Sequence, residues 1–112
     1  MAIENKNTIV EVEDDSLYTL SLKKPIVYNE KEYSELTFDF EKLTGNDALN
    51  IEDELNAVGK MAIVPVFSGE YLIRMAAKAC TEPVGADFFK LLPISDYNRI
   101  RSRARSFLLK SE

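Results

Sequence analysis

The sequence predicts a single small α+β domain, in which an N-terminal β-hairpin packs on a bundle of about four helices. Two segments before residue 41 alternate apolar and polar side chains, as half-buried strands do. Later segments repeat apolar residues at helical spacing, and residues 68–80 are apolar over nearly the whole circumference of a helix. With 112 residues, of which 46% are hydrophobic, the chain can bury one modest core. We therefore expect one domain over residues 17–112.

The hairpin is predicted over about residues 18–39. Pro25 cannot donate a backbone hydrogen bond, so it marks the end of the first strand or a bend. The polar residues 29–31 are expected to form the turn. The side chains expected to face the core are Tyr18, Leu20, Leu22, Leu36, Phe38 and Phe40.

A first helix is expected from about Gly45 to Val58. Thr44 followed by Asp47 has the spacing of a capping box, and Gly59 stands where a left-handed C-terminal cap is favoured. The apolar residues spaced for one face are Ala48, Ile51, Leu55 and Val58.

The helix over residues 68–80 is expected to lie at the centre of the fold, with Ser68 as its N-cap. Only Glu70, Arg74 and Lys78 interrupt its apolar surface, and their spacing of four places them in one polar stripe. Cys80 is the only cysteine and lies on the apolar surface. It is therefore interpreted as a buried structural thiol in a reducing compartment, rather than as a nucleophile.

Two further helices are predicted near the C-terminus. Pro83 suits the first turn of a short helix that Pro93 ends. The residues expected on its buried side are Val84, Phe88 and Leu91. A final amphipathic helix is expected after its N-cap, Ser95. Its apolar face holds Tyr97, Ile100, Ala104, Phe107 and Leu108.

The last helix carries four arginines in two pairs spaced by four residues. Arg101 pairs with Arg105 in this spacing, and Arg99 pairs with Arg103. The two pairs fall on opposite flanks of the apolar face, so they do not form one basic surface.

Charge is unevenly distributed along the chain. Residues 1–56 contain 14 acidic and 5 basic residues, whereas residues 57–112 contain 5 acidic and 9 basic residues. Opposite charges on neighbouring copies attract one another, which favours self-association into a homo-oligomer. Residues 1–16 end in the acidic run 11–15, and we expect them to form a flexible acidic N-terminal arm.

The residue types that most catalytic and metal sites need are missing. The chain has no histidine, one cysteine and four dispersed glycines. General-base histidines, thiolate-rich metal sites and glycine-rich phosphate loops are therefore excluded. The longest apolar run, residues 61–67, is too short to cross a bilayer. The sequence thus predicts a protein that is not an enzyme, uses no cofactor or metal ion, has no membrane segment and works by contact.

The sequence resembles the small tail assembly chaperones of long-tailed phages and prophages. The likeness extends over about residues 19–109 and depends on the order and spacing of several pieces. They are residues 22–26, 28–33, 35–37 and 40–47 in the first half, and residues 71–72, 75–79, 83, 91–93, 96–97 and 107–108 in the second. Family members often have glycine after the central helix, where this chain has Thr81 and Glu82, so a different cap is expected there.

The resemblance implies a function without catalysis. Proteins of this family bind the long, apolar, helical tape measure protein in the cytoplasm of the bacterial host and keep it soluble before the tail tube polymerises. They are absent from the finished virion. Many of their genes also yield a longer product by programmed frameshift, and this sequence, ending at Glu112, would be the short form.

The partner-binding residues expected on the last helix are Arg101, Arg105, Phe107, Leu108 and Leu109. Apolar anchors rimmed by adaptable charge suit a helical partner. One alternative is that Phe107 and Leu108 only cover the central helix. A rival function is a phage-encoded regulator that binds nucleic acid or a host protein through this basic helix. The net charge of −5 and the division of the arginines between two flanks make nucleic acid the less favoured partner.

Overall fold

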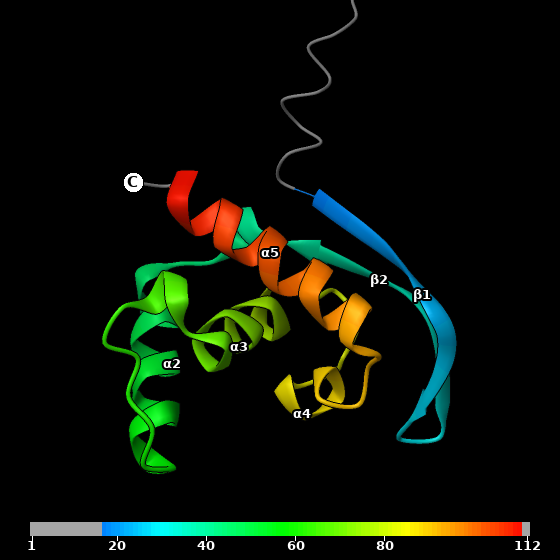
Figure 1. The fold of residues 1–112 in the computed structure, drawn as a ribbon, viewed down its shortest axis with the longest axis horizontal. Helices are drawn as coiled ribbons and strands as arrows, with labels where there is room; N and C mark the ends of the chain where they lie inside the picture. Colours follow the sequence, from blue (N-terminus) through cyan, green and yellow to red (C-terminus); the bar gives the residue numbers. More distant parts are fainter. Residues whose placement is uncertain (1–16, 111–112) are drawn as a thin grey trace, which may run out of the picture.

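A computed structural model of the chain describes residues 17–110. The predicted architecture is confirmed: within these residues, an antiparallel two-stranded hairpin precedes four α-helices in one compact α+β domain (Figure 1). The predicted acidic arm, residues 1–16, lies outside the described residues. The elements in order are β1 (Leu17–Tyr28), β2 (Lys31–Asp39), η1 (Phe40–Lys42), α2 (Gly45–Ala57), η2 (Pro65–Phe67), α3 (Gly69–Ala79), α4 (Ala86–Phe89) and α5 (Ile94–Lys110).

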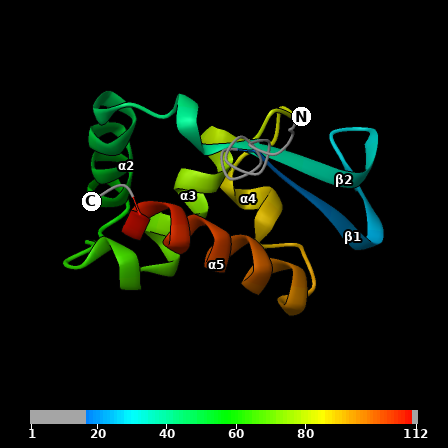
Figure 2. The ribbon, with the colours of Figure 1, turned by 90° about the horizontal axis from the view of Figure 1, so that it is seen from above.

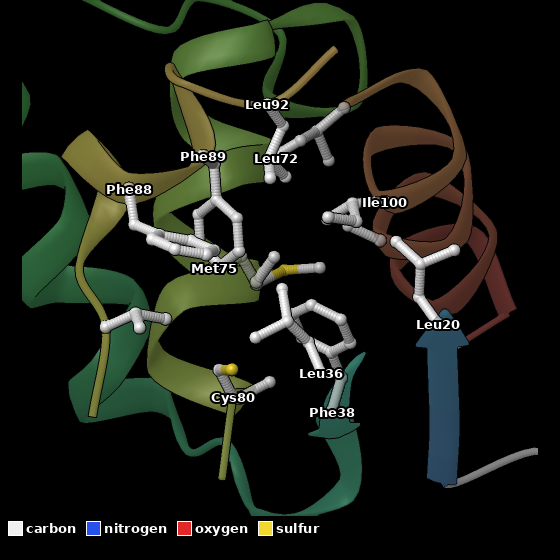
Figure 3. Packing of buried hydrophobic residues seen from close by; sticks show 14 of the residues in the cluster. Leu20, Leu36, Phe38, Leu72, Met75, Cys80, Phe88, Phe89, Leu92 and Ile100 are labelled. Atoms are coloured by element: carbon white, nitrogen blue, oxygen red, sulfur yellow. The ribbon is translucent and has the colours of Figure 1, made fainter. Parts of the chain in front are cut away.

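The predicted central helix, α3, is confirmed as the centre of the fold. It contacts α2, α4, α5 and β2. Two views at right angles show α2 at one end of the molecule and the tip of the hairpin at the other, with α3 between them (Figures 1 and 2). Side chains from both strands, α4 and α5 meet around α3 (Figure 3). The buried residues of α3 are Tyr71, Leu72, Ile73, Met75, Ala76 and Ala79.

The hairpin buries the face that alternation predicts and adds one irregularity. Of the predicted inward residues, Tyr18 is half-buried and the others are buried. Ser21 pairs with Glu35 and Ile26 with Tyr33, so four residues of β1 lie opposite one residue of β2. Pro25 falls in this bulge, where no ladder donor is needed. The strand therefore bends at the proline and continues to Tyr28.

The bulge and the tip of the hairpin are each held by an aspartate. The Lys23 N–H in the bulge donates to Oδ2 of Asp96, a fully buried side chain in the first turn of α5 that also pairs with Arg99. Near the tip, the Tyr28 hydroxyl lies 3.0 and 2.9 Å from the two carboxylate oxygens of Asp87 in α4. These bonds connect the hairpin to the helices beyond the apolar contacts.

The caps of α2 and the N-cap of α3 follow the prediction. Thr44 and Asp47 form the reciprocal capping box, and the Ser68 hydroxyl accepts the Tyr71 N–H at 3.1 Å. Gly59 has φ +75°, and the Lys60 N–H bonds to the Leu55 carbonyl, as in a Schellman cap.

Val58 was expected on the buried face of this helix, and that prediction is wrong. α2 ends at Ala57, and the Val58 side chain is 57% exposed. The turn that begins the C-terminal cap takes Val58 off the helical face.

The prediction for α4 is wrong in part, because the helix is only four residues long. Val84 and Phe88 are buried as expected, but Leu91 is 60% exposed. Phe89 and Leu92 are buried instead. The helix ends at Phe89 with Lys90 as its C-cap, so the spacing that would bring Leu91 inward does not persist.

The starts and ends of the neighbouring helices also differ from the sequence pattern. α5 begins at Ile94, so Ser95 lies in its first turn and is not the N-cap. The Pro93 carbonyl accepts the Tyr97 N–H in that turn. At the end of α3, Cys80 is extended and bridges to Phe38, while the Thr81 N–H donates to the Thr37 carbonyl. The helix thus ends against the edge of β2, without glycine.

Candidate partner-binding surface

The arginines of α5 lie on two flanks, as predicted. On one flank, Arg105 Nε donates to the Val66 carbonyl at 3.2 Å, and Arg101 Nε lies 3.7 Å from the position that a Cβ on Gly69 would occupy. On the other flank, the Arg103 guanidinium stands 4.8 Å from the centre of the Tyr18 ring. The first flank therefore faces the junction of η2 and α3, and the second faces the hairpin.

The apolar residues at the end of α5 divide between the core and the surface. The Phe107 ring stacks on Phe40 with centroids 5.4 Å apart, and Leu108 is half-buried against the core. Leu109 is 51% exposed. Thus Phe107 and Leu108 do cover the core, which was the alternative reading of their pattern. The structure brings Arg101 and Arg105 together on one flank and leaves the Leu109 side chain exposed to solvent at the end of the same helix.

The largest concentration of exposed apolar side chains lies elsewhere, in the segment between α2 and α3. We call this segment, residues 58–68, the connector. Ile63 is 85% exposed, and its exposed apolar neighbours are Val58, Met61, Val64 and Phe67. In Figure 1 the connector runs back along α2 and reaches η2 beside α5. Contiguous exposed apolar side chains are a common feature of interaction surfaces, so the connector is a candidate partner-binding surface.

Shallow hollows open on both sides of the connector. The first, about 390 Å³, lies between the connector and α2 and is lined by Glu52, Leu55, Asn56, Met61, Ala62 and Ile63. The second, about 420 Å³, is lined by Met61, Ala62, Ile63, Val64, Phe67 and Ser68. Met61 and Ile63 therefore border both hollows, and a ligand that lies along α2 would touch both residues.

The connector is fixed in place although its side chains face solvent. At its start, Lys60 Nζ donates to Oε2 of Glu70 at 3.0 Å, and this bond holds the pKa of the Glu70 carboxyl below its ordinary value. At its other end, Arg105 Nε holds the Val66 carbonyl, and the Ser68 N–H bonds to the Pro65 carbonyl at 3.0 Å. A prepositioned apolar surface loses little conformational entropy when a partner binds.

The polar stripe of α3 holds this end of the molecule together. Arg74 reaches both Glu70 and Glu54 at 3.4 Å, and Lys78 Nζ lies 3.0 Å from Glu54. The stripe that the sequence predicts on α3 therefore joins α3 to α2, and α2 forms one wall of the first hollow.

The sequence predicts residues 61–67 only to be an apolar run too short to cross a bilayer, and does not mark them as a candidate surface. A signal was present: this run has neither helical nor strand periodicity and contains Pro65, so no regular element would bury it. What the sequence could not give is the direction of each side chain. That direction depends on how η2 packs against α3 and α5.

Within the described residues, no group of three or more histidine, cysteine, aspartate or glutamate side chains is placed to hold a metal ion. Burial raises the pKa of the Cys80 thiol to about 12, so the thiol stays protonated at neutral pH. No helix in residues 17–110 is long and apolar enough to cross a membrane.

Comparison with known proteins agrees with a surface that acts by contact. The family described as phage tail assembly chaperone proteins, E, or 41 or 14, matches residues 19–109. No curated protein and no solved structure matches the chain. The family match extends from β1 into the last turns of α5, and so includes the connector and both flanks of α5. The chain belongs to the phage tail assembly chaperone family.

Proposed function

We propose that this chaperone binds the tape measure protein in the host cytoplasm and keeps it soluble until the tail tube polymerises. It leaves as the tube forms and is absent from the virion. It performs no catalysis and needs no cofactor. The main support for the proposal is that the connector exposes apolar side chains while hydrogen bonds fix its two ends.

A long apolar helix suits this surface for two reasons. An amphipathic helix binds by placing its apolar face against an apolar groove, and Met61, Ile63 and Phe67 supply apolar anchors beside the two hollows. The unbranched side chain of Met61 adapts to varied partner surfaces, as a chaperone for a long sequence requires.

The flank of α5 that carries Arg101 and Arg105 forms the charged edge of the same surface. Arg105 contacts the connector through Val66, and Arg101 lies one turn earlier on α5. In this proposal, both arginines face acidic groups of the partner, and Leu109 extends the apolar surface along α5. Phe107 and Leu108 contribute only the parts of their side chains that the core leaves exposed.

We further propose that several copies bind along one tape measure protein and associate with one another. A long partner offers repeated sites, and neighbouring copies raise the effective concentration of each contact. A longer form of the chain made by frameshift would share this surface.

The connector is tested by co-expressing the full chain with the large coiled-coil-rich protein that the family role predicts is encoded nearby. The double variant Ile63→Ser with Phe67→Ser removes two exposed anchors and should weaken co-purification about tenfold or more. The matched control, Leu91→Ser with Ile94→Ser, removes two exposed apolar side chains outside the connector. Equal capture by the wild type and the connector variant, both folded, would exclude this surface.

The arginine edge needs a separate variant, because Arg105 also holds the connector backbone. Arg101→Glu reverses a charge without breaking that bond. It should weaken co-purification most at low salt, since the edge acts through screened charge. The rival function, a nucleic-acid-binding regulator, is tested by titrating DNA binding with salt, because contacts to several phosphates weaken steeply as salt rises.

A further inference from the structure

The two hollows beside the connector differ in charge. One wall of the first hollow is α2, which places Glu52 and Asn56 on it, and the other wall is the connector, which supplies Met61 and Ile63. Every side chain that lines the second hollow is uncharged. Of the two, only the first therefore combines an apolar wall with a carboxylate.

The carboxylate of Glu52 has no ion pair or side-chain hydrogen bond within residues 17–110, and the side chain is exposed. Its neighbour Glu54 is already paired with two cationic side chains of α3. Lys60, at the start of the connector, is bonded to Glu70. The charge of Glu52 is thus available to a ligand that enters the hollow.

The sequence of α2 makes this wall acidic. From Thr44 to Gly59 the chain has four acidic residues and no basic residue. The last turn of α2, where the helix dipole is negative, also has no basic side chain. A cationic group of a ligand is therefore favoured at this wall.

We propose that the first hollow receives a lysine or arginine side chain of the partner helix, an inference that rests on the proposed function of the connector. A basic side chain has an apolar stem and a charged end. Its stem can pack on Met61 and Ile63 while its charged end meets the carboxylate of Glu52. The Asn56 side chain adds an amide oxygen that accepts a hydrogen bond. An acidic side chain is disfavoured in the same place, because it would face a like charge.

The first hollow and the arginine edge give the partner surface opposite charges at two places. The hollow borders residues 61–63 of the connector, whereas Arg105 holds the Val66 carbonyl nearer its other end. A helix that lies along the connector must then carry a base over α2 and acids over α5. This order of charges selects one direction of the helix on the surface.

The test uses the full chain and three synthetic helical peptides that share one leucine face. All three carry glutamates at one end, for the arginine edge. At the other end, two positions beside the leucine face hold lysine, glutamine or glutamate. Fluorescence anisotropy at physiological salt should show that the lysine peptide binds about two- to fivefold more tightly than the glutamine peptide, the range for an exposed ion pair, and that the glutamate peptide binds most weakly.

Charge variants identify the site. Glu52→Lys should reverse the order of the three peptides, because the anion that attracts lysine becomes a cation that attracts glutamate. Asp53→Lys makes the same charge change at the next residue of α2, which does not line the hollow, and should keep the wild-type order. Both residues are exposed, so neither variant disturbs the core, and circular dichroism checks that both are folded.

The connector double variant, Ile63→Ser with Phe67→Ser, separates this inference from the proposed function. If it weakens binding of all three peptides while Glu52→Lys leaves their order unchanged, the connector binds helices without selecting a base, and only this inference is overturned. Equal reversal by Glu52→Lys and Asp53→Lys also overturns it, since the general charge of α2 would then explain the selection. If the double variant binds every peptide as tightly as the wild type does, the connector is not the helix-binding surface, and the proposed function loses its support as well.

Discussion

Glu70 shows how one residue of the polar stripe positions the candidate surface. Its carboxylate pairs with Lys60 at the start of the connector and with Arg74 on its own helix, at 3.0 and 3.4 Å. Lys90, beside α4, lies 3.7 Å away. One side chain therefore links the connector to α3 and to the segment after α4. Removing it should loosen the connector before it destabilises the core.

Glu70→Gln should lower the free energy of unfolding by about 0.2–1 kcal/mol at pH 7, the range for solvent-exposed ion pairs. The hydrogen bond from Lys60 and the nearby cations lower the folded-state pKa of Glu70 below its ordinary value of 4.5. A carboxyl with a lowered folded-state pKa contributes stability above its unfolded-state pKa, and loses it as pH falls through the folded-state value.

The difference between wild type and Glu70→Gln should therefore shrink as the pH falls below 4.5, and urea unfolding at several pH values measures it. Asp53→Asn is the matched control, since Asp53 is exposed on α2 and no ion pair of the described residues is shown for it. A difference that persists unchanged in strong acid would contradict the electrostatic explanation.

The turn of the hairpin departs most clearly from local backbone preference. Asn29 and Glu30 have φ of +52° and +67°, the left-handed values that a two-residue hairpin turn requires. Asparagine tolerates this region, whereas a glutamate there is strained. The register of β1 and β2 fixes the loop length, so the strands impose this conformation on Glu30.

Glu30→Gly should raise the free energy of unfolding by about 0.5–1 kcal/mol, because glycine adopts the left-handed conformation without strain. The greater conformational entropy of glycine in the unfolded state offsets part of this stabilisation. Thermal unfolding followed by circular dichroism measures the change. Glu30→Ala removes the same charge and keeps a Cβ, so it should give no such gain. Equal stabilisation by both variants would attribute the effect to charge rather than to backbone conformation.

Elements defined by local chemistry were predictable from the sequence. The capping box at Thr44 and the left-handed Gly59 depend on residues within a few positions of one another, and both are present. The strand faces and the apolar surface of α3 follow from periodicity.

Features that depend on packing between distant residues were not predictable. The choice of Phe89 and Leu92 over Leu91 depends on where the chain leaves α4, and the exposure of Ile63 depends on η2 packing against α3 and α5. Likewise, spacing alone could not show that Phe107 would stack on Phe40 while Leu109 stays open. The sequence therefore predicts the arginine edge of the candidate surface, whereas its apolar centre is visible only in the structure.

Opposite charges are separated along the chain, but some of them pair in the folded protein. Among the described residues, those before residue 57 have a net charge of −5 and those after it a net charge of +5. Some of this charge is satisfied inside the molecule, because Glu54 of α2 pairs with Arg74 and Lys78 of α3. The exposed acids of α2, Glu52 and Asp53, and exposed bases such as Lys110 remain available to other copies.

We expect the isolated protein to self-associate at low salt through these charges. Light scattering should give a mass above the 12.7 kDa of one chain, and the mass should fall toward that value as salt rises, because screening weakens contacts between exposed charges. The connector offers a competing mechanism, since exposed apolar surface also drives association and salt does not weaken it.

Comparing the wild type with the connector double variant separates these two mechanisms. If charge drives association, Ile63→Ser with Phe67→Ser should associate like the wild type at low salt, and the connector stays open for the tape measure protein. If the connector drives it, that variant should be monomeric at every salt concentration, and binding of a partner must then displace a second copy. A wild-type monomer at high protein concentration and low salt would contradict self-association by either mechanism, leaving the partner itself to bring copies together.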